Sequence, residues 1–183
     1  MQLRMAARSI YAHEALGQRR QVFFVSHYGY DNHDELFYNQ ARNLGEVSQA
    51  LKNIQDAMDA IGKTDEVVLF TASDFARTLN SNGQGSDHAW GGNQIVMGGP
   101  VVGGQLHGTL RATEEPAGYP MSLAPQNPLD LGRGRLLPTT AVDEVACELA
   151  LWYGIRNDNQ IETILPNIRE FFTGDGYPIG FLT

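Results

Sequence analysis

Acidic and histidine side chains form two groups in this chain of 183 residues, and each group follows an apolar run. The first run is residues 21–26 and the second is residues 67–73. Hard divalent metals accept carboxylate oxygen, and zinc accepts neutral imidazole as well, so these side chains predict a site for zinc, manganese or a mixed pair of metals. The candidate metal ligands are Asp31, His33, Asp74 and His88.

The same residues also have simpler explanations. Asp31 and Asp34 are well placed to cap a following helix, which leaves His33 as a solvated neighbour. Asp87 and His88 together are typical of a surface turn. Acids and imidazoles that converge on one edge of a sheet are unfavourable unless a cation neutralises them, so the presence of both groups favours the metal site.

Arg77 is the candidate substrate-binding residue. Its guanidinium matches the geometry of phosphate or sulfate, although a salt bridge with a neighbouring acid is an equally good explanation. The Gly-Arg-Gly-Arg run at 132–135 allows the same two interpretations. His13 and His107 have no acidic partner at ligand spacing, so we exclude them.

The elements that must position these residues are a strand, a helix and a second strand. Apolar and β-branched residues predict strands over 21–26 and 67–73. Apolar residues spaced by three and four predict a long helix from Phe37 to Ile61, ended by Gly62. Because this order favours a right-handed crossover with parallel pairing, the predicted fold class is α/β, with a parallel-rich sheet flanked by helices.

The remaining sequence fits a single domain over residues 1–183, with an irregular excursion over 99–137 that is rich in glycine and proline. A first helix is expected within 1–16, and a short strand at 94–97. Two more helices are expected near the end of the chain. One has a threonine N-cap and ends at Gly154, with Val142, Val145, Leu149 and Trp152 facing the core; the other covers 161–172 and is kinked or restarted at Pro166.

Composition excludes some partners. The net charge of −8 and the pI near 5.0 argue against binding to nucleic acid or anionic lipid, because both need a basic surface. No apolar run approaches the length of a membrane span. The one cysteine, Cys147, excludes an internal disulfide and is expected to be a small buried residue.

Several motifs resemble the carboxyl-terminal half of the bacterial family called domain of unknown function 1501. They lie at residues 23–26, 29–34, 69–78, 87–93, 97–99 and 132–135, so the resemblance covers nearly the whole chain. That family is similar to the alkaline phosphatase and sulfatase superfamily, whose metal-dependent enzymes hydrolyse or transfer phosphate and sulfate esters on an α/β sandwich. The resemblance therefore implies an alkaline phosphatase-like fold, of which this chain is the carboxyl-terminal part.

The resemblance also implies individual roles. Asp74 looks like the strand-end ligand of one metal and His88 like the later histidine ligand of the other, while Asp31 and His33 resemble the pair that completes the second site. Phe75 departs from the pattern, because the better-known enzymes have a metal-binding histidine there. The superfamily's nucleophile comes from an amino-terminal half that has no counterpart in this sequence.

The implied function is a metal-dependent hydrolase of small anionic phosphate or sulfate esters, if an amino-terminal half completes it. The alternatives are a non-catalytic metal- or ligand-binding module and the structural remnant of a truncated gene. A chain that enters its fold midway should associate with itself or with a separately encoded partner. The resemblance suggests an exported or periplasmic bacterial protein, although Arg4 and Arg8 interrupt the opening apolar residues, unlike an export signal.

Overall fold

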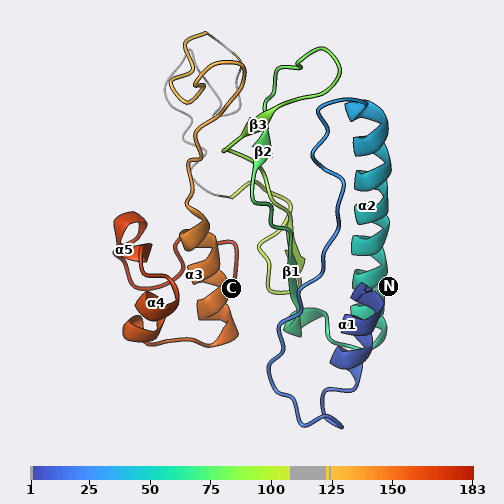
Figure 1. Cartoon of the computed structure of the whole chain (residues 1–183). Coiled ribbons are helices and arrows are strands. Elements are labelled where there is room, and N and C mark those ends of the chain that lie inside the picture. Colours follow the sequence, from blue (N-terminus) through green and yellow to red (C-terminus); the bar gives the residue numbers. More distant parts are fainter. Residues whose placement is uncertain (1, 108–122, 124) are drawn as a thin grey trace.

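The computed structural model describes residues 2–107, 123 and 125–183 (Figure 1). The helices of this part are α1 (Gln2–Tyr11), α2 (Leu36–Ala60), α3 (Val142–Tyr153), α4 (Asp158–Ile164) and α5 (Ile168–Phe171). The strands are β1 (Val68–Phe70), β2 (Ala76–Arg77), β3 (His88–Ala89) and β4 (Val96–Gly98), and a 3-10 turn, η1 (Thr64–Glu66), precedes β1. No helix in the described ranges is long and apolar enough to cross a membrane.

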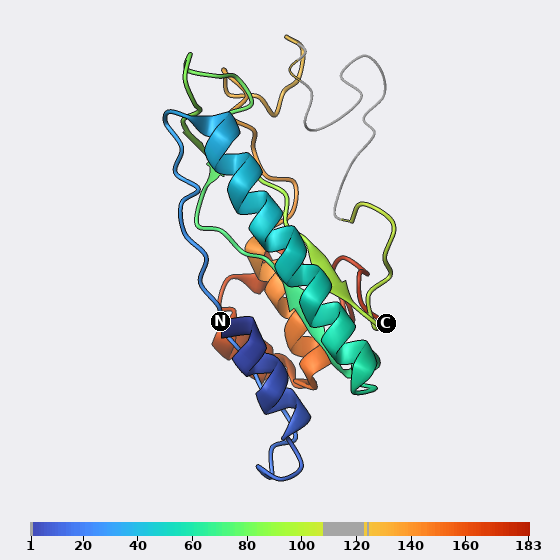
Figure 2. The same ribbon diagram turned by 90° about the vertical axis from the view of Figure 1, so that its right-hand side faces the viewer.

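The strands lie between two groups of helices. Helix α2 covers one side of the strands, and α3, α4 and α5 lie on the other (Figure 1). In the view turned by 90°, α2 stands in front and α3 behind (Figure 2). The two strand pairs therefore have helices on both sides (Figure 1).

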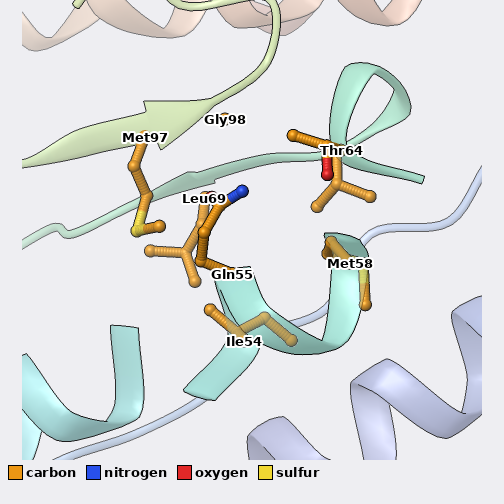
Figure 3. A pocket seen from close by; sticks show the side chains of 8 residues that line it. Ile54, Gln55, Met58, Thr64, Leu69, Met97 and Gly98 are labelled. Carbon is orange, nitrogen blue, oxygen red and sulfur yellow. The ribbon is translucent and has the colours of Figure 1, made fainter. Parts of the chain in front are cut away.

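The long helix predicted from apolar spacing is α2. It ends where expected, because Gly62 adopts the left-handed backbone conformation (φ +67°) that favours glycine. Only the second half of its apolar stripe is covered by the strands. Side chains that line the small recess between α2 and the β1–β4 pair include Ile54, Met58, Leu69 and Met97 (Figure 3). In the first half, Phe37 is 90% exposed and Leu44 is also exposed.

Both strand pairs are antiparallel. Strand β1 pairs with β4, with Leu69 opposite Met97, and β2 pairs with β3, with Arg77 opposite His88. The prediction of a strand over 21–26 is wrong, because no described residue pairs with this segment in a ladder. No parallel pairing occurs among the described residues. An alkaline phosphatase-like fold stays a prediction.

Residues 21–30 run beside α2 as an unpaired segment. The Asn43 side-chain amide on α2 donates to the Gly29 carbonyl (2.5 Å), and the Ser26 backbone N–H donates to the Gln2 side chain of α1 (2.9 Å). Without a neighbouring strand, Val22 and Phe24 are left 80% and 91% exposed. Exposed apolar side chains of this size are typical of a contact surface, and association with a second copy or another chain stays a prediction.

The carboxyl-terminal helices have their own small core. It consists of Cys147, Ile161 and Ile168, so Cys147 is buried as predicted. Pro166 separates α4 from α5, which confirms the restart. Of the segment 99–137, residues 108–122 and 124 lie beyond the described residues. The described part of it contains isolated bridges and no helix or longer strand.

Two expectations for α3 were wrong. Its N-cap is Ala141 rather than a threonine, and the Glu144 carboxylate accepts the Ala141 backbone N–H (2.8 Å) in place of a hydroxyl cap. Its buried residues are Cys147 and Glu148, and Val142 is 78% exposed. The reason is that α5 packs on the side of α3 that carries Cys147, and the chain end covers the side that carries Glu148.

Glu148 joins α3 to the end of the chain. Its carboxylate is fully buried and accepts the backbone N–H groups of Ile179, Gly180 and Leu182, each at 2.8 Å. Leu182 in turn forms an antiparallel bridge with Val101, shortly after β4. One buried side chain thus links the carboxyl-terminal helices to the chain that leaves the strands.

The Glu148→Gln variant should be less stable than the wild type by roughly 2–4 kcal/mol, because an amide nitrogen would face backbone donors in a buried site. Urea unfolding gives the free energy of unfolding, and hydrogen exchange should become faster at Ile179, Gly180 and Leu182. Glu170→Gln, at an exposed position on α5, is the matched control. Equal stability of the two variants would contradict the anchoring role.

Candidate metal centre

Three of the four predicted ligands lie together. One ligand atom from each of Asp31, His33 and His88 lies within 4.8 Å of the others, and all three residues are exposed. The Asp31 Oδ1 atom is 2.8 Å from His88 Nε2 and 3.0 Å from His33 Nε2, and the two Nε2 atoms are 3.3 Å apart. Asp74, the fourth predicted ligand, is exposed and is not part of this group.

Asp31 and His33 reach the cluster from the segment that precedes α2. The loop after β2 passes directly over this segment at Gly85, where a Cβ atom would lie 2.4 Å from the Asn32 carbonyl oxygen. The Ser86 backbone N–H donates to that same carbonyl (3.1 Å). Only glycine allows this approach, and the approach brings the loop against the backbone of His33.

His88 reaches the cluster from the β2–β3 pair. Directly opposed residues of an antiparallel pair project to the same face, so the register places the Arg77 and His88 side chains side by side. Phe75 stacks on the His88 ring, with centroids 4.2 Å apart and planes 23° from parallel. This contact restricts the plane of the imidazole ring.

Arg77 forms hydrogen bonds to the two parts of the chain that meet at the cluster. Its Nε donates to the Ser86 hydroxyl (3.0 Å), its Nη2 donates to the Ser86 carbonyl, and its Nη1 donates to Asp31 Oδ1 (2.5 Å). The side chain is only 16% exposed. The salt bridge considered as an alternative for Arg77 is therefore formed, with Asp31 as the acid.

Asp87 lies on the other side of His33. Its Oδ1 is 3.4 Å from His33 Nδ1 and accepts the Asn82 amide (3.1 Å), and its Oδ2 accepts Arg133 Nη2 (2.6 Å). Arg133 thus forms a salt bridge, and Arg135 donates to the Gly132 and Leu131 carbonyls instead. Sequence reasoning gave Asn82 no role, since nothing in an asparagine within a polar loop identifies its partner.

The carboxylates of Asp31 and of the neighbouring Asp87 are both held in the ionised form. A hydrogen bond from His88, followed by one from Arg77, lowers the pKa of Asp31. Hydrogen bonds from Asn82 and then Arg133 lower the pKa of Asp87. The helix-capping alternative does not fit this arrangement, because the Asp31 carboxylate bonds within the cluster and α2 has no side-chain cap at Glu35.

The remaining histidines lie outside the cluster. His27 Nε2 contacts Glu46 (3.0 Å) and its Nδ1 accepts the Tyr30 hydroxyl (2.8 Å). Burial, and then the charge of Glu46, raises the pKa of Tyr30, which keeps the phenol protonated. His13 and His107 contact only backbone carbonyls among their hydrogen-bond partners, consistent with their exclusion.

A family model described as "Protein of unknown function (DUF1501)" matches residues 2–165. No curated protein and no solved structure matches the chain.

The lowered pKa values predict how stability depends on pH. Because Asp31 and Asp87 have folded-state pKa values below the ordinary value of 3.8, their ionised forms stabilise the fold above about pH 3.8, and this contribution is lost as the pH falls through the folded values. The double variant Asp31→Asn/Asp87→Asn should therefore lose less stability on acidification than the wild type. Urea midpoints measured across the acidic range provide the test, with the exposed Asp175→Asn as control; identical profiles for the double variant and wild type would contradict it.

Proposed function

The chain belongs to the DUF1501 family, and we propose that Asp31, His33 and His88 form a binding site for one divalent cation, zinc or manganese. The observation that carries the proposal is the spacing of the three ligand atoms, which is 2.8–3.3 Å. Tetrahedral bonds of about 2.0–2.1 Å require ligand atoms about 3.3 Å apart, so these residues fit such an ion with little rearrangement.

The donor set supports the same proposal. Two imidazoles and one carboxylate are common at catalytic zinc sites, where an open position remains for water or substrate. The same set occurs at non-haem iron sites, so elemental analysis has to identify the metal. Phe75 has no ligand atom and covers one face of His88, which favours one cation here rather than two.

We further propose that the bound ligand is a small oxyanion or its ester, as the resemblance to phosphatases and sulfatases suggests. A divalent cation in such a site polarises phosphoryl or sulfuryl oxygens. Arg77 is the protein's own contribution to anion binding: Ser86 holds two of its nitrogens, and Nη1 lies at the cluster, bonded to Asp31 Oδ1, with which a bound anion would share it. A planar guanidinium held in this way suits phosphate and sulfate.

A binding module without chemistry is the second candidate. Ser86 and Thr78, which are both buried, carry hydroxyls next to Asp87 and Arg77 in the sequence. Ser86 Oγ accepts a bond from Arg77, and Thr78 Oγ1 donates to the Asn80 carbonyl. Neither hydroxyl has a neighbouring general base in these contacts, so neither matches an activated nucleophile.

Zinc titration tests the metal site directly. Asp31→Ala and His88→Ala should each reduce zinc affinity by at least about 100-fold, because loss of a direct ligand costs more than loss of an outer-shell group. Calorimetry and elemental analysis before and after chelation give the affinity and the stoichiometry. His13→Ala is the control, since this histidine lies outside the cluster. Wild-type protein that takes up no divalent metal would end the proposal.

Asp74 as a fourth ligand stays a prediction, and the same titration tests it. Asp74→Asn removes the carboxylate while keeping the size of the side chain. Reduced zinc affinity in this variant would bring Asp74 into the site on metal binding, and unchanged affinity would limit the site to the three grouped residues.

Negligible hydrolysis of aryl phosphates and aryl sulfates is expected from this chain alone, because neither Ser86 nor Thr78 contacts a general base among the described residues. Turnover should be measured with added zinc or manganese, and inorganic phosphate binding should be measured in parallel by calorimetry. Arg77→Ala should weaken phosphate binding without abolishing metal uptake. Metal-dependent hydrolysis that disappears in His88→Ala would show instead that the chain is a complete enzyme.

A further inference from the structure

We propose that Asp87 is a positioning residue that fixes the orientation and the tautomer of His33, with Asn82 and Arg133 holding Asp87 in place. The inference rests on the proposed function, in which His33 is a cation ligand, and adds the residues that make it a competent one. None of the three touches the ligand atoms of Asp31 or His88 in any hydrogen bond of the described residues.

The contacts of His33 support this assignment. Its Nε2 faces Asp31 and His88, and its Nδ1 faces Asp87 Oδ1 at 3.4 Å. A neutral imidazole carries one proton, and an ionised carboxylate can only accept. Asp31 Oδ1 faces Nε2 in the same way at 3.0 Å, so the two carboxylates compete for the ring proton. When a cation occupies Nε2, the proton is left on Nδ1, where Asp87 accepts it, and this is the form that binds a metal.

Asn82 connects Asp87 to the backbone of His33. Its side-chain NH₂ group donates both to the His33 carbonyl and to Asp87 Oδ1, each at 3.1 Å. Its Oδ1 accepts the backbone N–H groups of Gln84 and Gly85, so the amide itself is held by the loop. One asparagine thus sets the carboxylate and the histidine at a fixed separation.

Arg133 donates to the second carboxylate oxygen of Asp87, and its own backbone has an unusual conformation. Its φ of +64° is left-handed, and both neighbours, Gly132 and Gly134, are left-handed as well. Asp130 Oδ1 accepts the N–H groups of both glycines, at 2.8 and 2.9 Å, which stabilises the turn. Glycine would adopt this conformation more easily, so an arginine here indicates that the side chain has a role, and its ionic partner is Asp87.

The test uses the full chain and two readouts. In the metal-free protein, ring-nitrogen chemical shifts measured by NMR should show a larger population of His33 with its proton on Nδ1 in the wild type than in Asp87→Asn. Zinc affinity should fall by about 10–100-fold in Asp87→Asn, as for other outer-shell partners of metal-bound histidines. In a His33→Ala background, Asp87→Asn should have no further effect on zinc affinity.

Arg133→Gly is the second variant, and it preserves the left-handed turn while removing the guanidinium. It should reduce zinc affinity by roughly 10-fold, in the same direction as Asp87→Asn. Arg135→Ala, which changes an arginine of the same turn that does not contact Asp87, is the matched control.

The outcomes separate this inference from the proposed function. If the wild type binds no zinc, the metal proposal fails, but the tautomer of His33 in wild type and Asp87→Asn still decides the positioning role. If zinc binds and Asp87→Asn changes neither the tautomer nor the affinity, the positioning role is overturned and the metal site stands. A loss of affinity that persists in the His33→Ala background also overturns it, because Asp87 would then act by another route.

Discussion

The three bonds of the Arg77 guanidinium hold together the two parts of the chain that form the cluster. Ser86 takes two of them and Asp31 takes the third. This matters because the segment that carries Asp31 has no strand partner among the described residues, so no backbone ladder fixes it. Its position depends instead on Arg77, on the close approach of Gly85, and on the bond from Asn43 to the Gly29 carbonyl. Contacts from side chains and loops, rather than from a paired strand, therefore hold this segment in place.

Local sequence patterns predicted the elements whose stability is local. Apolar spacing identified α2, Gly62 marked its end, and Pro166 divided the last helices, because each signal acts within a few residues. The prediction for 21–26 failed for the opposite reason. Valine and phenylalanine favour a strand only where another strand pairs with them, and the pairing partner is not a property of the segment itself. The prediction of which α3 residues face the core was also wrong, because burial of Cys147 and Glu148 depends on the distant segments that pack against them.

The candidate site likewise has a part that the sequence predicted and a part that it did not. Asp31, His33 and His88 were identified from residue type and from the family resemblance, and the structure brings them together. The contacts that support them were not identified, because those from Asn82 to His33 and from Arg133 to Asp87 span 49 and 46 residues and depend on the shapes of two loops. Glycines at 85, 132 and 134 were visible as loop formers. Their specific effects, a close approach and a left-handed turn, follow only from the neighbours they meet.

Charge balance in the cluster bears on what it can bind. Asp31 is paired with Arg77 and Asp87 with Arg133, so the two carboxylates are already matched by two guanidiniums. Calcium and magnesium sites usually concentrate unpaired carboxylate and carbonyl oxygens, and this cluster has imidazole nitrogens instead, which suits zinc better. A divalent cation added to a balanced set would leave excess positive charge beside Arg77. An anionic ligand would neutralise that charge, whereas a neutral one would not, so under the proposed function the protein's own ion pairs favour phosphate or sulfate groups over uncharged ligands.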